Sequence, residues 1–102
     1  MAGKAGTVYI KADRNAEVAK TSVTIGDVLK IECTDPAMLA RIRSIHLLTF
    51  HHPDDKRQCR TVVSLLKVIQ KIHEIYPDAT VANIGETDFI VTDEEFVLQI
   101  VL

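Results

Sequence analysis

The segment from residue 64 to residue 77, SLLKVIQKIHEIYP, constrains the fold more than any other part of the sequence. Its apolar side chains recur at the i, i+3, i+4, i+7 spacing of one helix face, at Leu65, Val68, Ile69 and Ile72. Ser64 can cap the first turn, and Pro77 ends the helix because a proline pushes the preceding residue out of the helical region. The sequence therefore predicts an amphipathic helix over residues 65–76 whose apolar stripe is buried against another layer.

A second, shorter helix is predicted over residues 36–44. Asp35 can cap its first turn, and the following proline suits the first helical position because its missing N–H would be unpaired there. One apolar stripe follows, at Met38, Leu39, Ile42 and Ile45. Thr24 and Asp27 match the S/T-x-x-D/E start pattern and predict one further helical turn around residues 25–29.

Segments rich in β-forming residues surround these helices, at residues 7–12, 30–34, 45–50, 59–63, 80–85, 88–93 and 96–102. The polar connector 13–22 shows no clear periodicity. Strands and helices alternate without a long βαβ series, so we expect an α+β fold, a mixed β-sheet with both main helices packed on one face. A chain of 102 residues, 47% hydrophobic and 25% charged, fits a single soluble domain over residues 1–102, with residues 1–6 as a disordered start.

Residues 51–59, HHPDDKRQC, gather two histidines, two aspartates and a cysteine. The proline and aspartates are typical of a turn, so we predict a β-hairpin of strands 45–50 and 59–63 with its loop at 53–57. Adjacent histidines on a strand point to opposite faces, whereas a structural zinc site needs four converging ligands. The sequence therefore predicts no metal site. If a metal were bound here, the ligands to mutate would be His51, His52, Asp54 and Cys59.

No set of residues forms a recognisable catalytic site. Cys59 beside a histidine lacks an oxyanion hole or nucleophile turn, and a structural thiol is the simpler interpretation. Cys33 falls in a predicted strand, and His46 and His73 are expected to be packing or surface residues. With no tryptophan and only two tyrosines and three phenylalanines, the chain has few aromatic platforms for nucleic acid. We expect no enzyme activity, no cofactor and no nucleic-acid partner.

Charge is distributed unevenly along the chain. Residues 41–71 hold seven basic and two acidic residues, a net charge of +5, whereas the whole chain carries −2. Such asymmetry can mark a surface that meets an anionic partner, and a solvated helix face and turn would give the same pattern. The candidate contacts for an acidic partner, a lipid headgroup or a carboxylate ligand are Arg41, Arg43, Lys56, Arg57 and Arg60.

Three blocks of the sequence resemble the N-terminal soluble domain of the stage V sporulation protein AA family of spore-forming bacteria. They are VYIKADRNAEV, VTIGDVLKIEC and TVVSLLKVIQKIHEIYPDATVANIGETDFIV. The third block contains a short β-segment running into a helix, a Tyr-Pro helix stop, and an Ile-Gly pair before a further β-segment. The likeness covers residues 7 to 92, nearly the whole chain.

The resemblance implies a component of the spore inner-membrane complex that moves dipicolinic acid, with calcium, into the developing spore and releases it at germination. Chains of this family continue into hydrophobic membrane segments, whereas no stretch here approaches the roughly 18 apolar residues of a membrane span. We therefore expect a soluble interaction domain, associated with the spore inner membrane in the full-length protein.

The expected partners of this domain are the other subunits of the dipicolinic acid transport complex. The sequence leaves the formation of a homo-oligomer as an open alternative. The alternative is a small-ligand module that recognises dipicolinate or calcium dipicolinate through its basic residues. Arginine suits such a ligand because its planar guanidinium can donate two parallel hydrogen bonds to a carboxylate.

Overall fold

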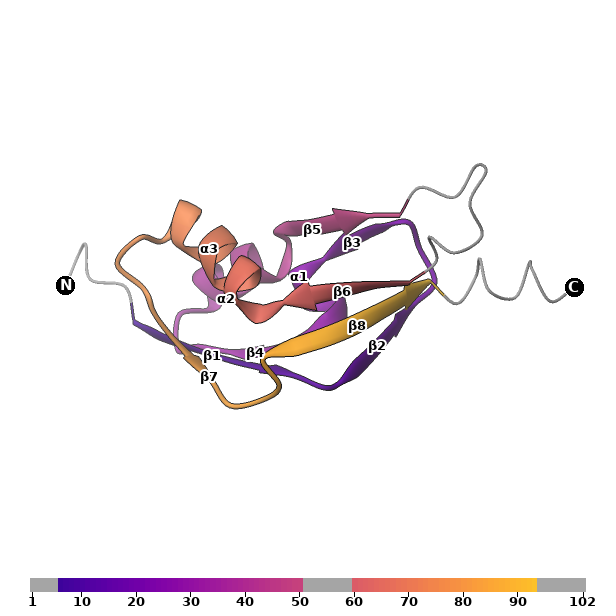
Figure 1. Ribbon diagram of the computed structural model, residues 1–102. Helices are drawn as coiled ribbons and strands as arrows, with labels where there is room; N and C mark the ends of the chain where they lie inside the picture. The colour runs from indigo at the N-terminus through magenta and orange to yellow at the C-terminus, as the bar shows by residue number, and fades with distance from the viewer. Residues whose placement is uncertain (1–5, 51–59, 94–102) are drawn as a thin grey trace, which may run out of the picture.

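The computed structural model describes residues 6–50 and 60–93, which form eight β-strands and three α-helices (Figure 1). The elements follow the order β1 (Thr7–Ala12), β2 (Asn15–Val18), β3 (Ser22–Thr24), α1 (Ile25–Val28), β4 (Leu29–Glu32), α2 (Pro36–Arg43), β5 (His46–Thr49), β6 (Arg60–Ser64), α3 (Leu65–Ile75), β7 (Thr80–Asn83) and β8 (Asp88–Asp93). The predicted α+β class is confirmed, and both main helices form, each ending one residue earlier than predicted. The predicted strand 96–102 lies outside the described residues.

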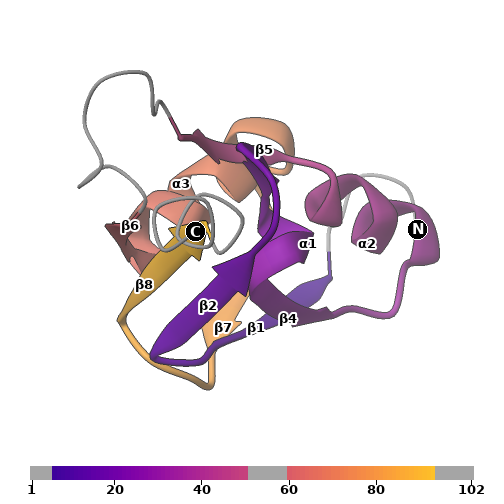
Figure 2. The ribbon, with the colours of Figure 1, turned by 90° about the vertical axis from the view of Figure 1, so that its right-hand side faces the viewer.

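The described strands form three small sheets. One has the order β4-β1-β7, with β4 antiparallel and β7 parallel to β1. The second has the order β2-β8-β6, with β2 parallel and β6 antiparallel to β8. The third is an antiparallel pair of β3 and β5. The predicted mixed pairing is therefore present, and its division among three sheets lets strands border the core on several sides (Figure 2).

An apolar core lies between these sheets and the helices. Both α2 and α3 lie on the same side of the β4-β1-β7 sheet (Figure 1). β1 contributes Ile10 and α3 contributes Val68 and Ile72, all with 0% of their surface exposed, and β8 contributes Phe89 at 1%. Each such side chain stabilises the fold by about 1.5–3 kcal/mol relative to an exposed one. The apolar stripe predicted for residues 65–76 thus faces the core.

Both helix caps predicted from the sequence are formed. Oδ1 of Asp35 accepts hydrogen bonds from the backbone N–H groups of Ala37 and Met38, at 3.0 and 3.2 Å. Oγ of Ser64 accepts one from the N–H of Leu66 at 3.2 Å. These side chains satisfy N–H groups that have no partner within their own helix, which is why the two helices begin where they do.

The predicted hairpin between residues 45–50 and 59–63 is wrong. β5 pairs with β3, and β6 pairs with β8, so the two strands belong to different sheets. Val63 of β6 lies opposite Phe89 of β8, and both side chains are buried. Burial against partners distant in the sequence therefore outweighs the local turn signal of residues 51–59, which lie outside the described part of the chain.

The connector 13–22, which has no clear periodicity, contains β2 and the start of β3. β2 runs parallel to β8, and its Val18 is buried with 6% of its surface exposed. A parallel partner comes from a distant part of the chain, so this strand leaves little trace in the local pattern of apolar residues.

Candidate functional site: a mixed-charge groove

An open groove of about 490 Å³ is bordered by β1, β2 and the turn between them, by α1 and β4, and by the end of α2. Six charged side chains line it: Lys11, Asp13, Glu17, Asp27, Lys30 and Arg43. We call this feature the mixed-charge groove. It joins residues that are distant in the sequence, because β4 pairs with β1 and α2 packs beside α1.

Two lysines lie side by side in this groove. Lys11 of β1 is directly opposite Lys30 of β4, and both side chains are exposed. Like charges directly opposite each other on neighbouring strands repel. Neither lysine forms an ion pair with another residue in the described part of the chain, so an anion between them would relieve this repulsion.

Arg43 reaches the groove because α1 packs directly on the end of α2. The N–H of Ile25 donates to the carbonyl of Ile45 at 2.9 Å, which fixes the start of α1 beside the residues that follow α2. A β-carbon placed on Gly26 would lie 2.9 Å from both the Cβ and the carbonyl oxygen of Arg43. The glycine therefore permits the close approach that holds Arg43 at the groove.

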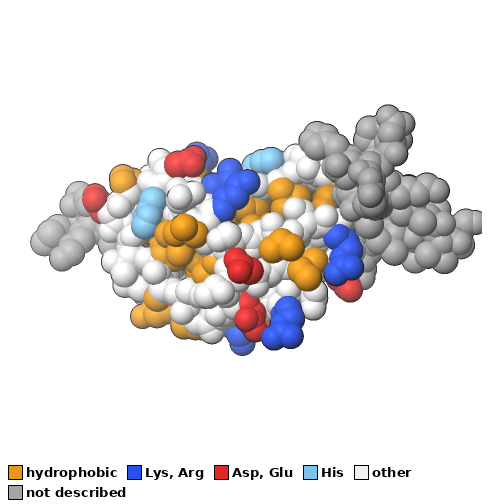
Figure 3. All heavy atoms as spheres, viewed as in Figure 1, with side chains coloured by type: hydrophobic (Ala, Val, Ile, Leu, Met, Phe, Trp, Pro, Cys, Tyr) orange, Lys and Arg blue, Asp and Glu red, His pale blue; other side chains and the backbone are white. Residues whose placement is uncertain are grey.

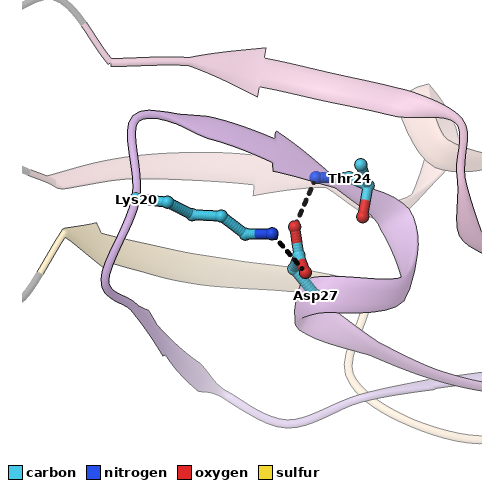
Figure 4. Close-up of polar contacts among 3 residues, drawn as sticks. All are labelled: Lys20, Thr24 and Asp27. Atoms are coloured by element: carbon cyan, nitrogen blue, oxygen red, sulfur yellow. Dashed lines mark hydrogen bonds and ion pairs between the residues drawn. The ribbon is translucent and has the colours of Figure 1, made fainter.

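Asp27 is held in the groove wall by two polar contacts (Figure 4). Its Oδ2 accepts a hydrogen bond from the N–H of Thr24 at 2.8 Å, and Nζ of Lys20 lies 3.0 Å from its Oδ1. Partial burial raises the pKa of Asp27, but the Thr24 hydrogen bond and the Lys20 ammonium lower it by more, so its pKa lies below the ordinary 3.8. Asp27 is therefore ionised at neutral pH, and Lys20 already balances its charge.

The charges that remain in the groove are then three cations and two carboxylates. Arg43, like the two lysines, forms no ion pair with any residue of the ranges 6–50 and 60–93. The mixed-charge groove thus has an excess of one positive charge and is suited to a partner that presents carboxylates.

The structure separates the basic residues predicted as one contact surface. Arg43 lines the mixed-charge groove, and Arg41 is exposed on the same helix, α2. Arg60 begins β6, which lies on the opposite side of the domain from α2 in Figure 2. Lys56 and Arg57 lie outside the described residues. Of the predicted set, Arg43 belongs to the groove.

Sequence reasoning missed Lys11 and Lys30. The alternation of apolar and polar residues in VYIKA and LKIE places each lysine on the outer face of its strand. That pattern gives no information on which strands pair, so their position opposite each other could not be predicted.

The histidines and the cysteine of the described segments take part in local contacts. Nε2 of His46 lies 2.8 Å from Oγ1 of Thr49, and Nε2 of His73 lies 2.9 Å from the carbonyl of Ala79. Cys33 is buried and directly follows β4, which ends at Glu32 and so does not reach residue 34 as predicted. Within residues 6–50 and 60–93, no group of three or more metal-ligating side chains is placed to hold an ion. His51, His52, Asp54 and Cys59 fall outside these ranges.

The fold and the groove define a small α+β domain with a charged groove on its surface. A family model described as "Stage V sporulation protein AA" matches residues 5–96, and the chain therefore belongs to this sporulation family.

A crystal structure described as that of a functionally unknown protein from Eubacterium ventriosum is similar to this fold. The TM-score is 0.75 and the sequence identity is 34%, over 84% of this chain and 90% of that one. A search of curated proteins finds no match. Among the described residues, the longest helices fall short of the length and hydrophobicity needed to span a membrane.

Proposed function

We propose that this chain is a non-enzymatic interaction domain of the spore inner-membrane complex that transports dipicolinic acid during sporulation and germination. Family membership supports the link to sporulation. The observation that carries the proposed role is the mixed-charge groove, in which Lys11, Lys30 and Arg43 have no ion-pair partner among the described residues.

The proposed partners are the other subunits of that complex. Complementary charges across an interface favour the correct partner and speed association, and a bidentate arginine–carboxylate pair adds a defined geometry. A partner segment carrying carboxylates would pair with Arg43 and relieve the repulsion between the opposed lysines. In this proposal the domain lies beside the spore inner membrane, as the family resemblance implies.

The test uses the full-length protein with its membrane segments, co-expressed with the other subunits. We expect the charge reversals Lys30→Glu and Arg43→Glu together to abolish co-purification of at least one subunit. The matched control reverses two charges on α3, Lys67→Glu and Lys71→Glu together, and both positions lie outside the groove. A full-length protein that binds none of the subunits would contradict the proposal. Equal binding by the groove and control variants would show that the groove is not the surface that contacts the other subunits.

A second candidate function is the binding of dipicolinate or calcium dipicolinate. The observation that favours it is that the same groove holds two opposed lysines and one arginine, which suits a ligand with two carboxylates. Calorimetric titration of the chain with each ligand tests it directly. Neither heat nor a thermal shift at millimolar ligand would count against it, whereas binding that Arg43→Glu weakens would support it.

A further inference from the structure

β6 is an edge strand, hydrogen-bonded to β8 alone among the strands that the structure describes. Just beyond its end, the N–H of Leu65 donates to the carbonyl of Thr87 at 2.8 Å. In an antiparallel pair every second residue directs both backbone groups to the neighbour, and the residues between direct theirs away. The N–H and C=O groups of Arg60 and Val62 therefore point toward the open edge of β6.

On its outer face, β6 has an exposed apolar side chain at its centre and charged or polar side chains at its two ends. Val62, with 69% of its surface exposed, is paired with half-buried Ile90 of β8. Arg60 lies at one end of β6, and Ser64, paired with Asp88, lies at the other. Figure 3 views this face and shows hydrophobic side chains over β6 and β8, with a basic side chain toward one end and an acidic one toward the other.

We propose that the open edge of β6 binds β6 of a second copy of this chain, antiparallel and centred on Val62. In that register Val62 lies opposite Val62 of the second copy, and Arg60 lies opposite Ser64 of the second copy. The outward-pointing N–H and C=O groups of Arg60 and Val62 then form hydrogen bonds between the two copies. A six-stranded sheet results, with the order β2-β8-β6-β6-β8-β2.

Charge complementarity supports this register. Ser64 is paired with Asp88 within one copy, so Arg60 of the second copy falls in the same cross-strand row as Asp88. Strands are about 4.8 Å apart, which places the two Cα atoms about 10 Å apart, a gap that these side chains can close together. Because the arrangement has two-fold symmetry, the ion pair forms twice.

The same ion pair cannot form within one copy. Arg60 is aligned there with Thr92, four residues from Asp88 along β8, which is a separation of about 14 Å. Between the two intermolecular pairs, the apolar side chains of Val62 and Ile90 from both copies form one continuous row. An edge strand with an exposed apolar residue at its centre and no proline is well suited to pairing with another strand.

A single pair of five-residue strands buries less area than the roughly 1,200–2,000 Å² of stable complexes, so the dimer is expected to be weak. Sedimentation of the whole chain from about 10 μM to about 1 mM should show a monomer that converts to a dimer. In parallel, hydrogen exchange at the amides of Arg60 and Val62 should slow by at least about tenfold at the high concentration.

Two matched variants test the centre of the interface. Val62→Lys places two like charges opposite each other and should raise the dimer dissociation constant by at least about tenfold. Ile84→Lys is the control, since Ile84 is similarly exposed at 65% but follows β7 in the other three-stranded sheet. Circular dichroism and thermal melts should show that both variants remain folded.

A charge exchange tests the register. Arg60→Asp alone and Asp88→Arg alone should each weaken the dimer, whereas the double variant should restore it. A purely structural effect within one copy would not be rescued, because these two side chains are too far apart there. Failure of the double variant to restore the dimer would overturn the proposed register.

Three further results would overturn the proposal as a whole. One is a chain that stays monomeric over the entire concentration range. Another is protection of the Arg60 and Val62 amides at the lowest concentration, which would mean that the chain covers its own edge. The third is protection that appears only when another subunit is added, which would assign this edge to a different protein. None of these results bears on the mixed-charge groove.

Discussion

Gly26 packs so closely on Arg43 that a β-carbon at this glycine would lie 2.9 Å from two atoms of the arginine, its Cβ and its carbonyl oxygen. We predict that Gly26→Ala destabilises the protein by about 1–3 kcal/mol through this overlap. The intrinsic helix preference of alanine acts in the opposite direction, by about 1 kcal/mol, so a net loss of stability identifies the clash as dominant.

Urea unfolding of Gly26→Ala measures this loss. Gly6→Ala is the control, because a β-carbon there would meet Oγ1 of Thr34 at an ordinary 3.9 Å. A Gly26→Ala variant as stable as the wild type would show that α1 can move away from α2 at no cost.

Gly85 makes an even closer approach to β1. A β-carbon on it would lie 2.6 Å from both the backbone N and the backbone O of Ala12. Backbone atoms of a central strand cannot move aside as a flexible side chain can. Gly85→Ala should therefore cost at least about 3 kcal/mol, the upper end of the range expected for Gly26→Ala. Thermal denaturation of both variants measures which one loses more stability. A larger loss for Gly26→Ala than for Gly85→Ala would contradict the prediction.

The lowered pKa of Asp27 predicts a pH-dependent contribution to stability. A carboxyl group whose pKa is lower in the folded state stabilises the fold above its unfolded pKa, and this stabilisation is lost as the pH falls through the folded pKa. Asp27→Asn should therefore lower the free energy of unfolding by about 0.5–1 kcal/mol near neutral pH.

The difference in free energy of unfolding between wild type and Asp27→Asn should stay constant above the ordinary carboxyl pKa of 3.8 and shrink at lower pH. Unfolding curves at several pH values measure it. Lys20→Ala should reproduce a smaller part of the loss, because Lys20 is half exposed and the Thr24 hydrogen bond remains. A difference that is independent of pH would show that the charge of Asp27 does not act on stability.

The two helix caps should differ in strength. Asp35 accepts two backbone hydrogen bonds through its carboxyl oxygen, whereas Ser64 accepts one through its hydroxyl oxygen. We expect Asp35→Ala to cost about 1–2 kcal/mol and Ser64→Ala about 1 kcal/mol. Chemical denaturation of both variants provides the comparison. Asp35→Asn should retain most of the stability because its side-chain oxygen can accept the same hydrogen bonds. A loss as large as that of Asp35→Ala would show that the cap acts through its charge alone.

Elements that depend on short-range signals could be predicted closely. Asp35 and Ser64 define where α2 and α3 begin, and the apolar stripes of both helices show which faces are buried. The alternation in TVYIKA predicts β1 with its observed limits, because alternate side chains of this strand lie on one buried face. The charge of Arg43 alone marks it as a candidate contact, and the sequence contains no sign that it shares a groove with Lys11 and Lys30.

The sequence by itself therefore determined the α+β class, the two main helices, their caps and the sporulation family. Only the tertiary structure decided which strands are neighbours. It paired β5 with β3 and β6 with β8, formed β2 from a polar connector, and left β6 as an edge. The physical reason is that strand pairing gains its free energy from contacts between residues far apart in the chain, and a local pattern does not encode these contacts.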